Sequence, residues 1–88
     1  MTTAEPRDIR LKRLRIRSWR RGIKEMDLIL GAFADSRLSD LDAAELDLFE
    51  ALLGENDHDL YQWVSGQTAP PEHLAGLIRR IGDAAGAT

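Results

Sequence analysis

Residues 17–27 of this chain, RSWRRGIKEMD, contain the groups best suited to recognising another polar surface. The guanidinium of Arg21 and the carboxylate of Glu25 are four positions apart, so on a helix they would point from the same side. Gly22 lies between them and has no side chain to keep another backbone away. One interpretation is a weak surface pair between Arg21 and Glu25, worth about 0–1 kcal/mol, beside a glycine that only turns the chain. The other is an exposed corner that binds a polar loop of another protein through bidentate hydrogen bonds.

The rest of the sequence lacks the residue sets that catalysis, metal binding or nucleotide binding require. It contains no cysteine, and His58 and His73 lie in different segments without a partner at ligand spacing, which argues against a zinc site. None of the seven glycines belongs to a GxGxxG or GxxxxGK motif. No Ser/His/Asp or Cys/His arrangement is present. We therefore expect no metal ion, no enzymatic activity, and no cofactor bound through a recognisable motif.

The length of 88 residues predicts one small domain, because a chain of this size buries only about 60% of its extended surface on folding. No stretch approaches the roughly 20 apolar residues that span a bilayer. The N-terminus lacks the apolar region of a secretory signal, and the absence of cysteine suits a reducing compartment. These features predict a cytoplasmic protein without direct membrane insertion.

The net charge of −3 conceals two segments of opposite sign. Residues 7–24 contain nine Lys or Arg and one acid, whereas residues 25–59 contain eleven Asp or Glu and one base. The basic segment could follow the phosphates of a nucleic acid, or it could be a solvated face that helps to hold a protein partner. The net acidity and the lack of a helix-turn-helix, zinc-finger or RNA-recognition signature argue against nucleic acid. We expect the acidic residues 40–59 to form a solvated helix face.

Helical periodicity runs through nearly the whole chain and predicts an all-α fold, a compact five-helix bundle. We expect helices at about 8–19 and 23–35, a third at 42–54, a fourth within 57–66, and a fifth that contains residues 74–81. The bundle domain would span 8–82, with a disordered N-terminus at 1–7 and a frayed C-terminus at 83–88. The first helix has an imperfect apolar stripe of Ile9, Leu11, Leu14, Ile16 and Trp19. The buried faces of the other helices are predicted at Met26, Ile29, Leu30, Phe33, Leu46, Phe49, Leu52, Leu53, Leu60, Tyr61 or Trp63, Val64, Leu74, Leu77, Ile78 and Ile81.

Local signals mark the helix ends. Gly22 separates the first two helices, where a glycine able to adopt positive φ would form a turn. Asp42 is followed three residues later by Glu45, which predicts a capping box at the start of the third helix. Asn56 or Asp57 would cap the fourth helix.

A resemblance to a known family rests on three segments, RSWRRGIKEMDLILGAFAD (17–35), LDAAELDLFEALLGENDHDLYQWVSGQ (41–67) and LAGLIRRI (74–81). They look like the succinate dehydrogenase assembly factors, the small flavinator proteins called SdhE in bacteria. The family hallmark, Arg-Gly-x-x-Glu, matches Arg21, Gly22 and Glu25 and would lie between the first two helices. Ile16 stands where the family often has an aromatic residue, and Ala32 where a basic residue is common.

The resemblance implies that the protein binds the flavoprotein subunit of succinate dehydrogenase, or also that of fumarate reductase, and promotes covalent attachment of FAD to it. FAD would then be carried by the partner, and the free chain would be a monomer. In our hypothesis Gly22 allows close backbone approach, Arg21 binds partner carboxylates or carbonyls, and Glu25 binds a partner base or amides. Peripheral contacts would come from Arg17, Arg20 and Asp27. The alternative is a nucleic-acid or other protein-binding module that acts through the basic helix.

Overall fold

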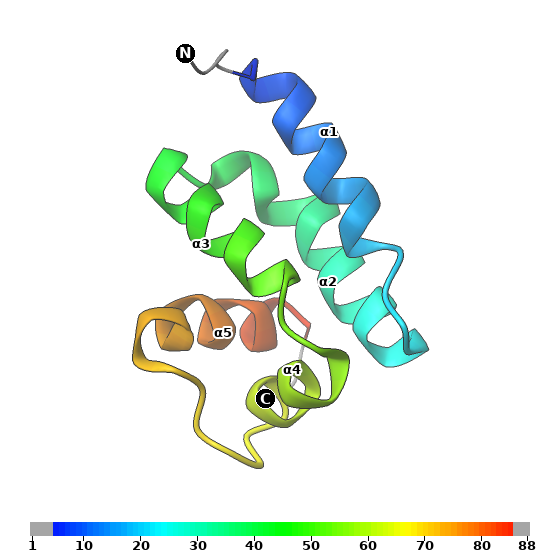
Figure 1. Ribbon diagram of the computed structural model, residues 1–88, viewed down its shortest axis with the longest axis vertical. Coiled ribbons are helices and arrows are strands. Elements are labelled where there is room, and N and C mark those ends of the chain that lie inside the picture. Colours follow the sequence, from blue (N-terminus) through cyan, green and yellow to red (C-terminus); the bar gives the residue numbers. More distant parts are fainter. Residues whose placement is uncertain (1–4, 86–88) are drawn as a thin grey trace.

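The computed structural model describes residues 5–85 and confirms an all-α fold with five α-helices (Figure 1). A short 3-10 helix that the sequence did not predict follows the second α-helix and redirects the chain. The elements in chain order are α1 (Arg7–Ser18), α2 (Lys24–Arg37), η1 (Leu38–Asp40), α3 (Ala43–Leu53), α4 (Asp57–Val64) and α5 (Glu72–Ala84).

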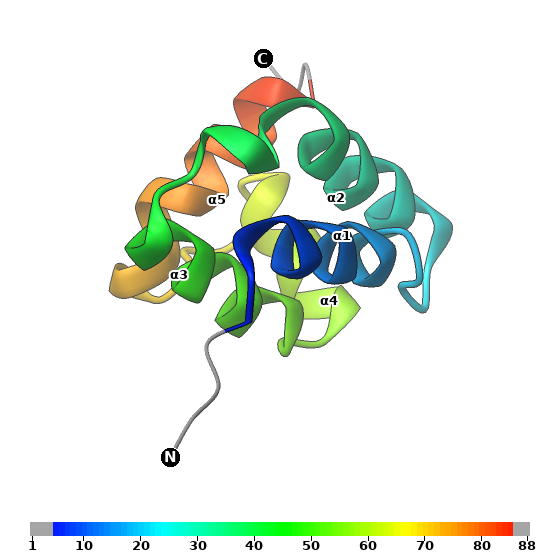
Figure 2. The ribbon, with the colours of Figure 1, turned by 90° about the horizontal axis from the view of Figure 1, so that it is seen from above.

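Helix α2 contacts α1, η1, α4 and α5. It packs along α1 on one side and contacts α4 and α5 on the other. Helix α5 runs across the lower part of the molecule in Figure 1, where it contacts α2, α3 and α4. Figure 2, seen from above, shows α1 lying between α2 and α3, and both of them contact it. The connection between α1 and α2 therefore forms an outer corner of the bundle.

The core is formed by the apolar faces that the helical spacing predicted. The rings of Phe33 and Phe49 stack with their centroids 5.8 Å apart and join α2 to α3. Ile29, Trp63 and Val64 are only partly buried against this core, and Tyr61 remains exposed, so Trp63 is the aromatic residue of α4 that packs inward. The buried residues are Leu14, Met26, Leu30, Phe33, Ala34, Leu38, Leu41, Leu46, Phe49, Leu52, Leu53, Leu60, Leu74, Leu77, Ile78 and Ile81.

Helix α1 buries much less of its apolar surface than the other long helices. Leu14 is its one fully buried apolar residue and Leu11 is half-buried. Ile9 and Ile16 are about half exposed, at 50% and 47%. The imperfect stripe in the sequence thus corresponds to a helix that contacts α2, η1 and α3 but leaves two of its apolar side chains half exposed.

The predicted caps of α3 and α4 are present. Asp42 accepts a hydrogen bond from the amide of Glu45 (2.8 Å), and Glu45 accepts one from the amide of Asp42 (2.9 Å), which completes a capping box. Of the two candidates for α4, Asn56 is the cap and accepts a hydrogen bond from the amide of Asp59 (2.8 Å). These caps satisfy backbone donors that a helix start otherwise leaves unpaired.

The helical region extends beyond the predicted bounds of 8–82 at both ends. Arg7 belongs to α1, and its guanidinium donates to the carbonyls of Ser39 (2.9 Å) and Leu41 (2.7 Å). Helix α5 continues through Ala84, so the predicted frayed end at 83–88 begins too early. The other terminal residues of those two predictions, 1–4 and 86–88, lie outside the described residues.

Basic residues of α1 pair with acidic residues of α3, which corrects the prediction of a solvated acidic face. Arg10 contacts Asp47 (2.7 Å) and Glu50 (3.1 Å), while Arg13 contacts Glu50 (3.0 Å) and Glu5 (2.9 Å). The hydrogen bond from Arg13, assisted by Arg10, lowers the pKa of Glu50. The two oppositely charged segments of the sequence therefore serve partly to hold α1 against α3.

No helix within residues 5–85 is both long enough and apolar enough to cross a membrane.

Candidate partner-binding corner

The corner between α1 and α2 holds all six residues that the sequence singled out for partner binding. Helix α1 closes at Trp19, whose amide donates to the carbonyls of Arg15 (3.3 Å) and Ile16 (3.2 Å). The chain then turns, and Ile23 is extended immediately before α2. Residues 19–23 connect the two helices without regular structure, so other interactions must fix their conformation.

Arg21 provides most of those interactions, and its side chain is only 10% exposed. Its Nε donates to Asp57 Oδ1 (2.8 Å), Nη1 to the carbonyl of Leu53 (2.6 Å) and Nη2 to the carbonyl of Glu55 (2.6 Å). The three acceptors come from the last residue of α3 (Leu53), the connection that follows it (Glu55) and the first residue of α4 (Asp57). The expectation of an outward-facing Arg21 is wrong, because its guanidinium points into the bundle and binds acceptors of its own chain.

Gly22 is exposed and its amide donates to Asp57 Oδ2 (2.7 Å). Its φ is not positive, which corrects the prediction that a left-handed turn requires glycine here; among the described residues only Gly66 has positive φ, at 83°. The reason for glycine is space, since a Cβ at position 22 would lie 2.7 Å from Asp57 Oδ2. Any side chain would push against the carboxylate that holds both Arg21 and Gly22.

Asp27 and Glu25, one turn into α2, have different environments. Asp27 is half-buried, and its Oδ1 accepts a hydrogen bond from the backbone amide of Arg21. It therefore helps to hold the corner from the α2 side, a contact that the sequence did not predict. Glu25 is exposed and makes no ion pair or side-chain hydrogen bond within residues 5–85. The weak Arg21–Glu25 pair considered in the sequence does not form, which leaves the Glu25 carboxylate available.

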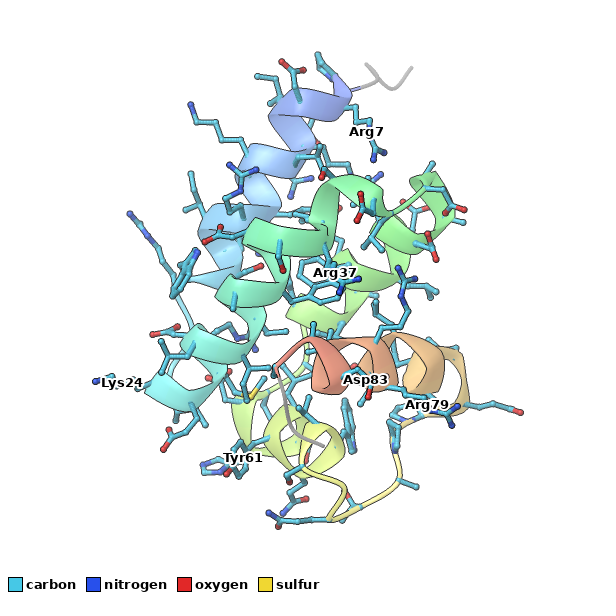
Figure 3. All side chains as sticks on the ribbon, turned by 180° about the vertical axis from the view of Figure 1, so that it is seen from behind. Arg7, Lys24, Arg37, Tyr61, Arg79 and Asp83 are labelled. Carbon is cyan, nitrogen blue, oxygen red and sulfur yellow. The ribbon has the colours of Figure 1, made fainter. Side chains whose placement is uncertain are left out.

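Arg17, Arg20 and Lys24 surround the corner with positive charge. All three are exposed, and none forms an ion pair with any residue that the structure describes. Figure 3 shows the side chain of Lys24 projecting away from the bundle at the start of α2. The available charges at this corner are thus three cations and the carboxylate of Glu25.

Trp19 shapes the surface beside the corner. Its ring lies over Gly31 of α2, where a Cβ would come within 2.3 Å of ring atoms Cδ2 and Cε2. Its indole N–H donates to Asp35 Oδ1 (3.3 Å), and Trp19 remains 40% exposed. Leu28, one turn before Gly31, is 52% exposed. An apolar surface thus adjoins the charged corner.

Two residues that matter at this site were missed or misassigned in the sequence. Asp57 was considered only as a helix cap, yet it binds Arg21 and Gly22 across 36 and 35 positions of sequence. Gly31 received no role in the sequence analysis. A glycine inside an apolar helical pattern was the one available signal, because such a glycine often marks close packing. Nothing local to Asp57 could have indicated its partners.

No group of three or more His, Asp or Glu side chains among residues 5–85 is arranged to hold a metal ion.

Comparison with known proteins places this arrangement in a family. The family model described as flavinator of succinate dehydrogenase matches residues 12–85. Similar proteins named succinate dehydrogenase assembly factor 2, mitochondrial, occur in two organisms. The protein from Mycosarcoma maydis is 38% identical over 90% of this chain and 33% of its own length. The protein from Drosophila grimshawi is 38% identical over 88% of this chain and 54% of its own length. Another, from Schizosaccharomyces pombe, is 40% identical over 77% of this chain and 49% of its own length. The chain spans between a third and about half of the length of these relatives. Since the family model matches residues 12–85, which is most of the chain, this protein belongs to the family of succinate dehydrogenase flavinators.

Proposed function

We propose that this protein is an assembly factor that binds the flavoprotein subunit of succinate dehydrogenase and promotes covalent attachment of FAD to it. Membership of the flavinator family and the names of the relatives support this function. The observation on the molecule itself that carries the proposal is the exposed corner. Gly22 and Glu25 are accessible there, and Glu25 makes no polar side-chain contact within the part of the chain that the structure describes.

The proposed mechanism is that of a chaperone rather than an enzyme. The FAD and the histidine that accepts it would both belong to the partner. By binding one arrangement of the immature subunit better than others, this chain would increase the population in which the two reacting groups are close and aligned. The covalent bond would then form inside the partner, so the chain needs no catalytic residues of its own.

The residues proposed to contact the partner follow from exposure and charge. Gly22 lets a partner backbone approach closely, and Glu25 accepts hydrogen bonds from a partner base or from backbone amides. Arg17 and Arg20 contribute peripheral contacts with acidic groups. Arg21 and Asp27 have a different part, because the structure uses their polar groups to hold the corner itself.

Several finer assignments remain predictions. The relatives' names refer to succinate dehydrogenase and lend no support to fumarate reductase or to nucleic-acid binding. Those names also place the relatives in mitochondria and do not support a cytoplasmic location, so the cytoplasmic location of this chain stays a prediction. The monomeric state of the free chain and the assignment of FAD to the partner are likewise part of the proposal.

The test is covalent flavin on the flavoprotein subunit, measured by in-gel fluorescence of the denatured subunit with and without this protein. Glu25→Ala should reduce both co-purification with the subunit and the fluorescent band. Glu72→Ala is the matched control, because Glu72 is also an exposed glutamate in the first turn of a helix, α5, distant in sequence from the corner. It should behave as the wild type does.

Two results would contradict the proposal. One is that Glu25→Ala co-purifies with the subunit and supports flavin attachment as well as the wild type and the control Glu72→Ala do. The other is failure of the wild-type chain to bind the subunit while it is retained on nucleic acid with an affinity that falls steeply with salt. The second result would favour the nucleic-acid alternative.

A further inference from the structure

The strongest unexplained feature is a set of hydrogen bonds that joins two distant connections of the chain. The guanidinium of Arg21, on the α1–α2 corner, binds Asp57 and the carbonyls of Leu53 and Glu55, on the α3–α4 connection. The amide of Gly22 binds the other oxygen of Asp57. We call Arg21, Gly22 and Asp57, with the carbonyls of Leu53 and Glu55, the corner fork.

Both ends of the corner fork are shielded from solvent. The side chains of Arg21 and Asp57 are 10% and 16% exposed. Asp57 is the first residue of α4 and follows the cap Asn56, so its backbone is fixed by regular structure. Each of its carboxylate oxygens accepts one hydrogen bond, from Arg21 Nε and from the Gly22 amide. Asp57 is therefore held in place by α4, and it in turn holds the α1–α2 corner.

The geometry leaves Arg21 little capacity to bind another protein. Three of its five N–H groups already have acceptors within the chain, at 2.6–2.8 Å. A partner that took over the guanidinium would leave two half-buried carbonyls and the Asp57 carboxylate without their charged donor. Leaving such groups unpaired costs more free energy than a surface contact provides.

We propose that Arg21 and Asp57 are positioning residues, which hold residues 20–23 in one conformation so that Gly22 and Glu25 meet the partner already ordered. This inference deepens the proposed function and rests on it. Ordering a flexible segment on binding reduces affinity, because each residue fixed costs backbone entropy. If only a fraction of free molecules has the corner in its binding conformation, the apparent dissociation constant rises by the inverse of that fraction. Asp57 thereby becomes a determinant of partner affinity that touches no partner.

A double-mutant cycle separates this role from direct contact. Arg21→Ala, Asp57→Ala and the double variant are compared with the wild type for their dissociation constants with the flavoprotein subunit. If Arg21 acts only through the corner fork, each single variant should bind roughly ten- to a hundredfold more weakly. The loss in the double variant should be clearly smaller than the product of the two single losses, because both substitutions remove the Arg21–Asp57 pair, although each also removes contacts of its own.

Three further measurements guard against a purely structural explanation. Circular dichroism confirms that each variant is helical at the temperature of the binding assay, and Asp57→Asn replaces Asp57→Ala if the alanine variant does not fold. Hydrogen exchange of the Arg21 and Gly22 amides in the free chain should accelerate in the Asp57 variant. Arg80→Gln is the control for loss of an arginine–carboxylate pair away from the corner: it removes the more exposed 2.6 Å pair to Glu45, between α5 and α3, and should bind as the wild type does.

The outcomes are distinct. A wild-type chain that does not bind the subunit overturns the proposed function. Wild-type binding combined with multiplicative losses in the double variant shows that Arg21 contacts the partner directly, and overturns this inference alone. Wild-type affinity of Arg21→Lys would also overturn this inference, since lysine keeps the positive charge but cannot reach three diverging acceptors. Unchanged exchange of the Gly22 amide in the Asp57 variant also overturns it.

Discussion

The same substitution, glycine to alanine, should have opposite effects at two helical positions of this protein. Gly31 lies in the middle of α2 and Gly76 in α5. A Cβ at position 76 would meet nothing within 4 Å, whereas a Cβ at position 31 would lie 2.3 Å from two atoms of the Trp19 ring. Helix propensity alone favours alanine over glycine by about 1 kcal/mol at either position. The difference between the two variants therefore measures the packing of Trp19.

The expected magnitudes follow from this geometry. Gly76→Ala should raise the free energy of unfolding by about 0.5–1 kcal/mol. In Gly31→Ala the Trp19 ring must move by about 1 Å or more to restore ordinary contact, which begins near 3.4 Å. Such overpacking costs about 1–3 kcal/mol, and the shifted ring also loses its hydrogen bond to Asp35, worth about 1 kcal/mol at most. After the gain in propensity of about 1 kcal/mol these terms span about 0–3 kcal/mol, and we expect Gly31→Ala to lower the free energy of unfolding by about 1–2 kcal/mol, the middle of that range.

Denaturant unfolding followed by circular dichroism gives both values, and the Gly31→Ala midpoint should fall by roughly 5–15 °C in a thermal scan. A Trp63→Phe background leaves Trp19 as the only tryptophan, so its emission should shift to the red as the ring leaves α2. In a Trp19→Ala background the obstacle is gone, and Gly31→Ala should become stabilising by about 1 kcal/mol. Stabilisation by Gly31→Ala in the presence of Trp19 would refute the packing that the structure shows.

Two further predictions concern helix α3. Asp42→Ala removes the capping box and should lower the free energy of unfolding by about 1 kcal/mol, while Asp42→Ser should keep most of it; equal stability of both variants and the wild type in urea titrations would contradict the role of the cap. Glu50 has a pKa lowered from its usual 4.5 by the hydrogen bond from Arg13, so the unfolded state binds more protons than the folded state as the pH falls. The stabilisation is therefore present above about pH 4.5 and is lost as the pH falls through the depressed folded pKa. Glu50→Gln should be less stable than the wild type at pH 7, and the difference in the free energy of unfolding should shrink as the pH falls below about 4.5; a difference that stays constant as the pH is lowered would contradict this linkage.

The elements of the fold were predictable because their signals are local. The stripes of α2, α3 and α5 repeat every three or four residues, and a helix needs no information from elsewhere to turn those residues to one side. The Asp42–Glu45 capping box spans three positions and depends only on its own geometry. The apolar face of α1 was harder to predict, because packing buries Leu14 fully and leaves Ile9 and Ile16 about half exposed.

The candidate site was predictable in location and not in mechanism. Arg21, Gly22 and Glu25 occupy one exposed corner, as the break at the glycine indicated. The direction of Arg21 depends on acceptors 32 to 36 residues away, and no pattern within the corner encodes where that segment packs. The reason for glycine at position 22 was unpredictable on the same ground, since the carboxylate that excludes a side chain there belongs to Asp57 of α4.

The distribution of charge along α1 connects the fold to the proposed function. At its N-terminal end, Arg7, Arg10 and Arg13 hold α1 against η1 and α3 through hydrogen bonds and ion pairs. Near its C-terminal end Arg15 pairs with Asp35 (3.7 Å), whereas Arg17, and Arg20 just beyond the helix, have no ion pair among the described residues and lie next to the corner.

A basic segment that appeared uniform in the sequence thus contains two kinds of residue. Some bind groups of the bundle, namely Arg7, Arg10, Arg13, Arg15 and Arg21. Others form no ion pair or side-chain hydrogen bond among the described residues, and three of these, Arg17, Arg20 and Lys24, lie at or near the corner. The available charge is concentrated where Gly22 and Glu25 are exposed, so attraction to an acidic partner surface would bring the corner in first. Neutralising Arg17 and Arg20 should therefore slow association with the flavoprotein subunit and weaken its salt dependence, with little effect on dissociation or on helix content. Neutralising Arg10 and Arg13 should instead lower the free energy of unfolding. A reversal of these two effects would show that the division of charge along α1 has been assigned to the wrong ends.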